Sequence, residues 1–341
     1  MKDEDGISKR RNMTVTGKPT VEYILAGYER GGTTLLSDLF RANGFESGFE
    51  CGVLLGKNPS EMPNINPYWD MLLSGWKISK ETRQAAISGS LEDFYQTICK
   101  AAFPEFNGSF FDKTPIYMKT LGTCINRAPF IKGAVVIHRD PRAVFASMAK
   151  RLSPNDSVAS GVEKNFKLLQ NRYLSYFIGS ISHLESKRVI FVPFEELASR
   201  ENVWLKTIGY FVNGKSFEKR DFKSRFENVT SSKMDLNKII EFNELLPIDL
   251  QNRILEATRL ASTFFAGPVE RAKYGDLWEE TLETAQKRLA EFDLPAVGMD
   301  IDGTYFEPLT YLIRYPDVLK AGVNPVEHFR KAGRREKRTP A

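Results

Sequence analysis

A glycine-rich segment near the N-terminus has the residues and the spacing of a phosphate-binding loop. Gly27 and Gly32 stand five positions apart and are followed by two hydroxyl residues, Thr33 and Thr34. The pattern approaches G-x-x-x-x-G-K-[ST], in which backbone N–H groups and the positive end of the next helix hold a phosphate. Threonine replaces the lysine that reaches the outer phosphates of a triphosphate, which argues against hydrolysis of ATP or GTP. Arg30, inside the loop, can supply the cation instead.

A second candidate for anion binding follows the apolar run 133–138. Arg139 would leave a strand there, and Ser147 would lie two turns into the helix that starts at Pro141. A guanidinium offers a charged fork of N–H groups and a serine offers a hydroxyl, so the two side chains can hold one phosphate together. An arginine next to an aspartate at a helix start is also found as a simple capping ion pair. The segment therefore indicates phosphate binding only in combination with the loop.

Strands and helices alternate around these residues. Short apolar runs predict buried strands at 21–26, 133–138 and 188–192, and helical periodicity predicts helices at 33–42 and 158–182. This alternation indicates an α/β fold. We therefore expect a P-loop-like parallel sheet flanked by helices, with a small helical appendage at the C-terminus.

Composition and charge narrow the class of protein. The 341 residues include 48 Lys and Arg against 43 Asp and Glu, a formal net charge of +5, which suits an anionic ligand without indicating nucleic acid. Three cysteines without framework spacing argue against a disulfide scaffold, so we expect a cytoplasmic protein. The sequence has no apolar run of about 18 residues that would predict a membrane-spanning helix. The polar residues 1–19 predict a disordered lead-in.

Taken in this order, the segments resemble the sulfotransferase family over roughly residues 20–265. The first loop is similar to the family's 5′-phosphosulfate loop, P-[KR]-S-G-T-T-x-L. The positions that agree are Arg30, Gly32, Thr33, Thr34 and Leu36. The chain departs from this pattern with Glu29 in place of proline and Gly31 in place of serine.

Two further segments carry the same resemblance. Arg139 and Ser147 have the eight-residue spacing of the family's 3′-phosphate motif, and the sequence R-D-P-R-A-V is common in bacterial and protein-tyrosine members. Residues 111–115, F-D-K-T-P, are similar to the D-K-T-P or K-D-P segment of those members. The set of motifs in this order is more specific than any one of them.

The resemblance implies in-line transfer of a sulfuryl group from 3′-phosphoadenosine-5′-phosphosulfate to a hydroxyl acceptor, without a metal ion. In this chemistry a base removes the acceptor proton, and cations stabilise the leaving phosphate. The residues that would bind the cofactor are Arg30, Gly31, Gly32, Thr33, Thr34, Leu35, Arg139 and Ser147. No metal-ligand spacing is found in the sequence.

The catalytic base is less well defined by the resemblance. Cytosolic small-molecule members place a histidine after the K-T pair, where this chain has Pro115. Tyrosine-specific and several carbohydrate members use a glutamate, for which Glu50 is the candidate, with Glu46 and Asp112 as alternatives. Lys113 is the candidate for stabilising charge on the transferred or leaving group.

Residues 303–341 form a separate pattern after a domain expected to span 20–302. Asn324 can cap a helix that starts with Pro325 and ends at Gly333. The segment resembles a module at the ends of bacterial surface-polysaccharide enzymes. This resemblance implies a carbohydrate acceptor, a capsular or exopolysaccharide unit, and docking through the module. A packed helical hairpin with a solvated basic tail fits the segment equally well, and a tyrosine or small-molecule acceptor stays open.

Two other functions remain compatible with the sequence. A P-loop nucleotide kinase would use the same loop, although the missing lysine argues against it. A non-catalytic nucleotide-binding scaffold in polysaccharide assembly stays open because of the departures at Glu29 and Gly31.

Overall fold

The computed structural model describes residues 19–184, 186–218, 237–261, 283–295, 298–338 and 340. The predicted lead-in at 1–19 thus lies, apart from its last residue, outside the described residues. Within the described ranges, no helix is long and apolar enough to cross a bilayer.

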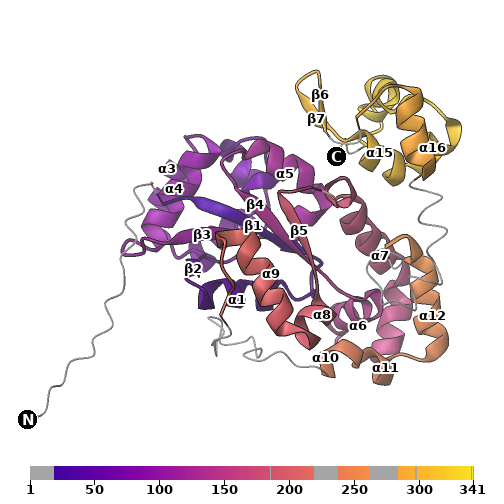
Figure 1. The fold of residues 1–341 in the computed structure, drawn as a ribbon, viewed down its shortest axis with the longest axis horizontal. Coiled ribbons are helices and arrows are strands. Elements are labelled where there is room, and N and C mark those ends of the chain that lie inside the picture. Colours follow the sequence, from indigo (N-terminus) through magenta and orange to yellow (C-terminus); the bar gives the residue numbers. More distant parts are fainter. Residues whose placement is uncertain are drawn as a thin grey trace, which may run out of the picture.

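A five-stranded parallel sheet forms the centre of the molecule (Figure 1). Its strand order is β2-β3-β1-β4-β5. The strands are β1 (Val21–Gly27), β2 (Phe45–Glu46), β3 (Ser109–Lys113), β4 (Gly133–His138) and β5 (Val189–Pro193). This confirms the expected α/β class, and the three predicted strands correspond to β1, β4 and β5.

Helices cover both faces of the sheet. Side chains alternate along each strand, so each strand places apolar residues on both faces, and both must be covered. Tyr23 and Leu25 of β1 pack in one apolar layer, and Ile24 and Ala26 pack in the other. The first layer contains α1 (Thr33–Ala42), α8 (Phe194–Ser199) and α9 (Glu201–Asn213). The second contains α4 (Leu91–Ala102), α5 (Leu121–Arg127), α6 (Pro141–Leu152) and α7 (Val158–Ile178). Burial on both sides explains why β4 is entirely apolar up to its last residue, His138.

Short helical elements connect the layers. Between β2 and β3 lie the 3₁₀ helices η1 (Val53–Leu55) and η2 (Pro59–Asn64), followed by α2 (Tyr68–Gly75) and α3 (Lys80–Ala86). η3 (Pro115–Thr120) follows β3, and η4 (Ile181–His183) follows α7, so the helix predicted over 158–182 ends earlier, at Ile178. After the first gap come α10 (Asn237–Ile240), α11 (Phe242–Leu245) and α12 (Ile248–Ala257), and residues 283–291 are helical.

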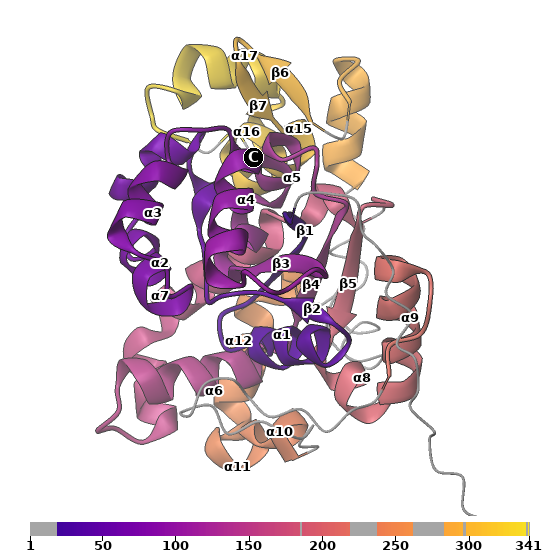
Figure 2. The same ribbon diagram turned by 90° about the vertical axis from the view of Figure 1, so that its left-hand side faces the viewer.

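The C-terminal unit starts with a hairpin of β6 (Met299–Ile301) and β7 (Thr304–Phe306). It continues with α15 (Pro308–Arg314), α16 (Pro316–Ala321), α17 (Pro325–His328) and a π-helical turn, η5 (Phe329–Gly333). The Asn324 side chain accepts hydrogen bonds from the N–H groups of Val326 and Glu327, as its capping position predicts. The domain boundary that we predicted at 302/303 falls within the hairpin turn, so the first strand of the unit precedes it. Figures 1 and 2 show this unit at one end of the molecule, away from α10 and α11.

A buried carboxylate joins the C-terminal unit to the rest of the chain. Glu307 is fully buried and contacts Nε2 of His183 at 2.8 Å, and it accepts hydrogen bonds from Ser182 at 2.7 Å and from Thr310 at 2.8 Å. Burial alone would raise the pKa of Glu307, but these hydrogen bonds and the nearby His183 hold the pKa below its ordinary value. The unit is therefore packed onto α7 and η4 through a buried carboxylate, and both oxygens of this carboxylate have hydrogen-bond partners.

Gly122 in α5 leaves the space for this contact. A Cβ at this position would lie 1.7 Å from Oε1 of Glu307 and 2.6 Å from Nε2 of His183. We expect Gly122→Ala to lower the free energy of unfolding by about 1–3 kcal/mol, because the buried carboxylate must move off its partner. Denaturant unfolding measures this loss. In a Glu307→Ala background the same change should cost much less, and equal costs in both backgrounds would contradict the contact.

Candidate active site

The loop after β1 adopts a conformation that depends on its glycines. Gly32 has a φ of 103°, and a Cβ there would lie 2.6 Å from Cδ2 of Phe194. The N–H of Gly31 donates to the carbonyl of Tyr28 at 2.8 Å, and a Cβ on Gly31 would lie 2.9 Å from that same oxygen. This tight turn leaves little room for a side chain at Gly31. Arg30, with a φ of 64°, lies at its tip.

The loop leads directly into α1. Thr33, Thr34 and Leu35 form the first turn of this helix. An α-helix leaves its first backbone N–H groups without partners inside the helix, and its dipole makes this end positive. The three residues predicted to hold a phosphate thus present donors at the end of β1.

The residues predicted to bind the two ends of a nucleotide meet in one cluster. Nε of Arg30 donates to Oγ of Ser147 at 3.1 Å, and Nη1 of Arg139 donates to the carbonyl of Arg30 at 3.1 Å. The guanidinium carbon of Arg139 lies 4.5 Å from the ring centroid of Phe194. Arg139 follows β4, and β4 pairs with β1, so the sheet brings the two motifs together.

The Arg139 guanidinium is buried, at 8% exposure. Burial lowers the pKa of Arg139, and the nearby Glu195 and Glu241 oppose this effect. Its Nε atom has no hydrogen-bond partner among the described residues. A buried cation with an unsatisfied donor is costly unless an anion accompanies it. This cluster therefore has the properties of an anion site.

Asp140 and Glu195 hold the start of α6. The Asp140 side chain caps the helix by accepting from the N–H of Arg142 at 2.8 Å. The N–H of Asp140 donates to Oε1 of Glu195 at 2.9 Å. Burial raises the pKa of Glu195 to about 7, against the lowering effect of that hydrogen bond.

This raised pKa predicts how stability depends on pH. The folded chain holds the Glu195 proton more tightly than the unfolded chain, so stability falls as the pH rises from about 4.5 to about 7. We expect Glu195→Gln to be more stable than the unaltered protein by about 1–3 kcal/mol at pH 8 and about equal at pH 5. Denaturant unfolding at both pH values tests this, with Glu105→Gln at an exposed position as the control. A difference that does not change with pH would refute the assignment.

Glu50 and Lys113 lie in direct contact. Nζ of Lys113 donates to Oε1 of Glu50 at 3.0 Å and lies 4.4 Å from the ring centroid of Phe49. Lys113 ends β3 beside Leu25 of β1, and the segment that carries Glu50 follows β2. Lys113 is only 3% exposed, whereas 19% of the Glu50 side chain remains exposed. The carboxylate can therefore contact a ligand while the lysine orients it.

A buried hydrogen-bond network fixes the backbone after Glu50. Asp112 is fully buried and accepts hydrogen bonds from Thr114 at 2.8 Å and from two tyrosine hydroxyls, each at 2.7 Å. Oγ1 of Thr114 accepts in turn from the N–H groups of Cys51 at 3.0 Å and Gly52 at 3.2 Å. Burial raises the pKa of Asp112. Asp112, an alternative base in the sequence analysis, is thus enclosed and serves to anchor the Glu50 segment.

Arg41, which no motif of the sequence indicated, organises the other side of this segment. Its guanidinium pairs with Asp38 at 3.2 Å and with Glu46 at 3.4 Å, and donates to the carbonyls of Ser47 and Gly48. Glu46, the other alternative base, is therefore engaged by Arg41. The only sequence signal was the arginine three residues after Asp38, a spacing common on exposed helix faces.

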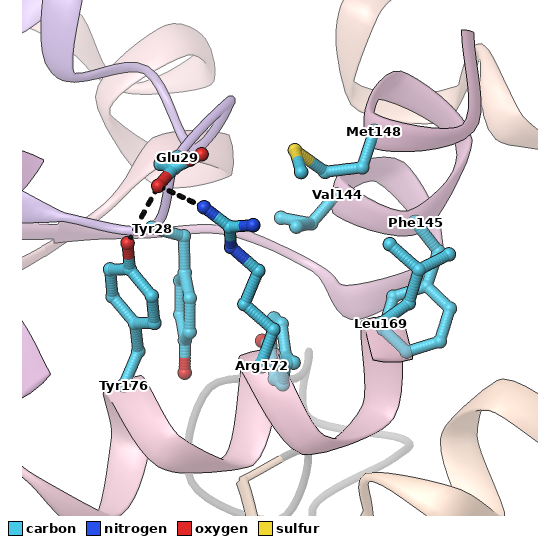
Figure 3. Close-up of a pocket in the computed structure, with 9 residues that line it drawn as sticks. Tyr28, Glu29, Val144, Phe145, Met148, Leu169, Arg172 and Tyr176 are labelled. Atoms are coloured by element: carbon cyan, nitrogen blue, oxygen red, sulfur yellow. Dashed lines mark hydrogen bonds and ion pairs between the residues drawn. The ribbon is translucent and has the colours of Figure 1, made fainter. Parts of the chain in front are cut away.

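A small pocket lies beside the loop, between α6 and α7 (Figure 3), and most of the side chains that line it are buried. Its walls are mainly apolar and aromatic. They include Tyr28, Val144, Phe145, Met148, Leu169, Tyr173 and Tyr176. Glu29 lies at the pocket, where it pairs with Arg172 and accepts a hydrogen bond from Tyr176 at 3.1 Å. The residue that departs from the family's proline thus connects the loop to α7.

Comparison with known proteins supports the fold. No family model and no curated protein matches the sequence. Among solved structures, the chain is similar to the sulfotransferase domain of the Synechococcus PCC 7002 olefin synthase, with a TM-score of 0.51 and 16% identity over 72% of this chain and 96% of that domain. The chain has a sulfotransferase-like fold.

Two weaker similarities involve proteins of the same description. The sulfotransferase domain from the curacin biosynthetic pathway has a TM-score of 0.46 and 16% identity, over 70% of this chain and 96% of that one. A mouse sulfotransferase complexed with PAP has a TM-score of 0.41 and 12% identity, over 74% and 87%.

Proposed function

We propose that this protein transfers a sulfuryl group from 3′-phosphoadenosine-5′-phosphosulfate to a hydroxyl acceptor. The observation that carries the proposal is the hydrogen-bonded cluster of Arg30, Arg139 and Ser147. It joins the loop after β1 to the segment after β4, at the carboxyl ends of adjacent parallel strands. Ligands of open α/β sheets bind at this edge.

The residues around the cluster fit the two ends of this nucleotide. Gly31, Gly32, Thr33, Thr34 and Leu35, with Arg30, would hold the 5′-phosphosulfate, and Arg139 with Ser147 would hold the 3′-phosphate. The buried Nε of Arg139, which has no hydrogen-bond partner among the described residues, supports an anion there. When bound, the nucleotide supplies the sulfuryl group.

The chemical roles of the remaining residues follow from their contacts. Glu50, partly exposed, would take the proton from the acceptor hydroxyl, because a neutral hydroxyl is a poor nucleophile. Lys113, held 3.0 Å from Glu50, would orient that carboxylate and stabilise negative charge that develops beside it. Arg30, at the tip of the loop, would add a second cation.

A carbohydrate acceptor, such as a capsular or exopolysaccharide unit, is the narrower part of the proposal. It rests on the resemblance of residues 303–341 to the module of surface-polysaccharide enzymes. Cytoplasmic action and docking through this unit belong to the same proposal. A kinase is disfavoured because Thr33 stands at the lysine position. A scaffold without turnover would share the nucleotide site and lack the reaction.

Transfer of labelled sulfuryl groups tests the proposal. The full chain, incubated with ³⁵S-labelled cofactor and oligosaccharides of bacterial capsules, should produce labelled sugar at a rate that EDTA does not change. Labelling from γ-³²P-ATP instead would favour the kinase. Tight binding of adenosine 3′,5′-bisphosphate with no transfer to any hydroxyl acceptor would favour the scaffold.

A further inference from the structure

A group of three cations lies where the pocket side of α7 meets the C-terminal unit, and the proposed reaction does not use them. This cation cluster consists of Lys119 in η3, Arg172 in α7 and Arg314 in α15. Arg172 pairs with Glu29 at the pocket (Figure 3), and Nζ of Lys119 lies 5.5 Å from the ring centroid of Tyr176. Nη2 of Arg314 donates to the carbonyl of Lys119 at 3.1 Å.

Positive charge exceeds negative charge around Lys119. Burial lowers the pKa of Lys119, repulsion from Arg172 and Arg314 lowers it further, and Glu29 acts in the opposite direction. Glu29 is itself shared between Arg172 and Tyr176. Among the ion pairs formed within the described ranges, none involves Lys119. An additional anion at this place would relieve the repulsion between the cations.

Tyr68 packs against the segment of the proposed base, because a Cβ on Gly52, two residues after Glu50, would lie 2.2 Å from Cγ of Tyr68. Burial raises the pKa of Tyr68, the carboxylates of Glu50 and Glu29 raise it further, and Arg172 opposes them. Tyr68 is therefore within electrostatic range of both the Glu50 carboxylate and the Glu29–Arg172 pair. An acceptor whose anionic group contacts the cations would present its hydroxyl to Glu50.

The fold holds Lys119 in place from two sides. Its carbonyl accepts the hydrogen bond from Arg314, and the backbone at Gly179 passes so close that a Cβ there would lie 1.9 Å from the Lys119 carbonyl oxygen. The N–H of Leu121 also donates to the carbonyl of Gly179 at 3.3 Å. These contacts fix the backbone of Lys119, which lowers the entropic cost of binding an anion through its side chain.

We propose that the cation cluster binds an anionic group of the acceptor, a carboxylate such as that of a uronic acid. Lys119 has three N–H donors and the Arg172 guanidinium has N–H groups beyond the one that pairs with Glu29. Arg314 acts through the backbone of Lys119 and is a positioning residue. This inference rests on the proposed function and adds the acceptor's charge to it.

Calorimetry tests the inference with a matched pair of sugars. A glucuronate-containing tetrasaccharide and its carboxyl-reduced, neutral counterpart are titrated into the full chain, with and without adenosine 3′,5′-bisphosphate. We expect the anionic sugar to bind at least tenfold more tightly, since charge-assisted hydrogen bonds are the strong ones. Lys119→Met and Arg172→Gln should each remove most of this preference, and Lys119→Arg should keep it.

The control variant removes a lysine elsewhere. Lys132 pairs with Glu22 at 2.9 Å at the opposite end of β4, and Lys132→Met should leave the preference unchanged. Equal binding of the two sugars, no binding of either, or loss of preference in Lys132→Met would overturn the inference. Failure of adenosine 3′,5′-bisphosphate to bind would instead refute the proposed function, and the titration without nucleotide still decides the acceptor's charge.

Discussion

Replacing Glu50 with glutamine should lower turnover by about 10²–10⁴-fold, the usual contribution of a general base. The amide keeps the size of the side chain and can still accept the hydrogen bond from Lys113, so the loop should remain in place. Affinity for adenosine 3′,5′-bisphosphate should stay within a few-fold, because Glu50 does not touch Arg30, Arg139 or Ser147. Steady-state transfer assays and calorimetry measure the two effects separately.

Three further variants separate the base from its neighbours. Lys113→Ala should also lose turnover, and it should weaken nucleotide binding somewhat because a cation beside the loop is removed. Glu46→Gln should change turnover little, since Glu46 contacts Arg41. Asp112→Asn should mainly lower stability, because Asp112 accepts three buried hydrogen bonds. Normal turnover in Glu50→Gln together with loss in Glu46→Gln would identify Glu46 as the base.

Replacing Arg139 with alanine should weaken binding of adenosine 3′,5′-bisphosphate by about 10–100-fold, because hydrogen bonds to charged groups contribute about 1.5–3 kcal/mol each. Ser147→Ala should lose less, since its hydroxyl is neutral. Thermal stabilisation by the bisphosphate should nearly vanish in the first variant and remain in the second.

A binding control is needed because Arg139 also supports the fold through its contacts with Arg30 and Phe194. Arg139→Lys keeps the charge and loses the fork, so it should fall between alanine and the unaltered protein. Unchanged affinity in both Arg139→Ala and Ser147→Ala would place the 3′-phosphate site elsewhere.

Local patterns in the sequence predicted the parts of the fold that depend on neighbouring residues. The apolar runs of β1, β4 and β5 and the helix after the loop are of this kind, because burial and periodicity can be read within one segment. β2 was missed because it contains two residues, Phe45 and Glu46, and pairs with β3 only over this length. The end of α7 at Ile178, four residues before the predicted end, depends on packing. The helix ends where Gly179 fits against the Lys119 carbonyl.

The site shows the same division between local and distant information. The motif spacings suggested Arg30, Arg139, Ser147, Glu50 and Lys113 individually. The sequence could not show that Lys113 touches Glu50 across 63 positions, or that Arg30 touches Ser147 across 117. The ranking of Asp112 below Glu50 rested on the resemblance alone, because enclosure by two tyrosines and a threonine depends on three separate segments.

The proposed function requires that the cluster of Arg30, Arg139 and Ser147 binds a nucleotide with a 3′-phosphate. Calorimetry of the full chain with adenosine 3′,5′-bisphosphate and with 5′-AMP tests this most directly, because the two ligands differ only in that phosphate. We expect the bisphosphate to bind at least tenfold more tightly, a difference of about 1.4 kcal/mol or more. Equal affinity for the two nucleotides would contradict it.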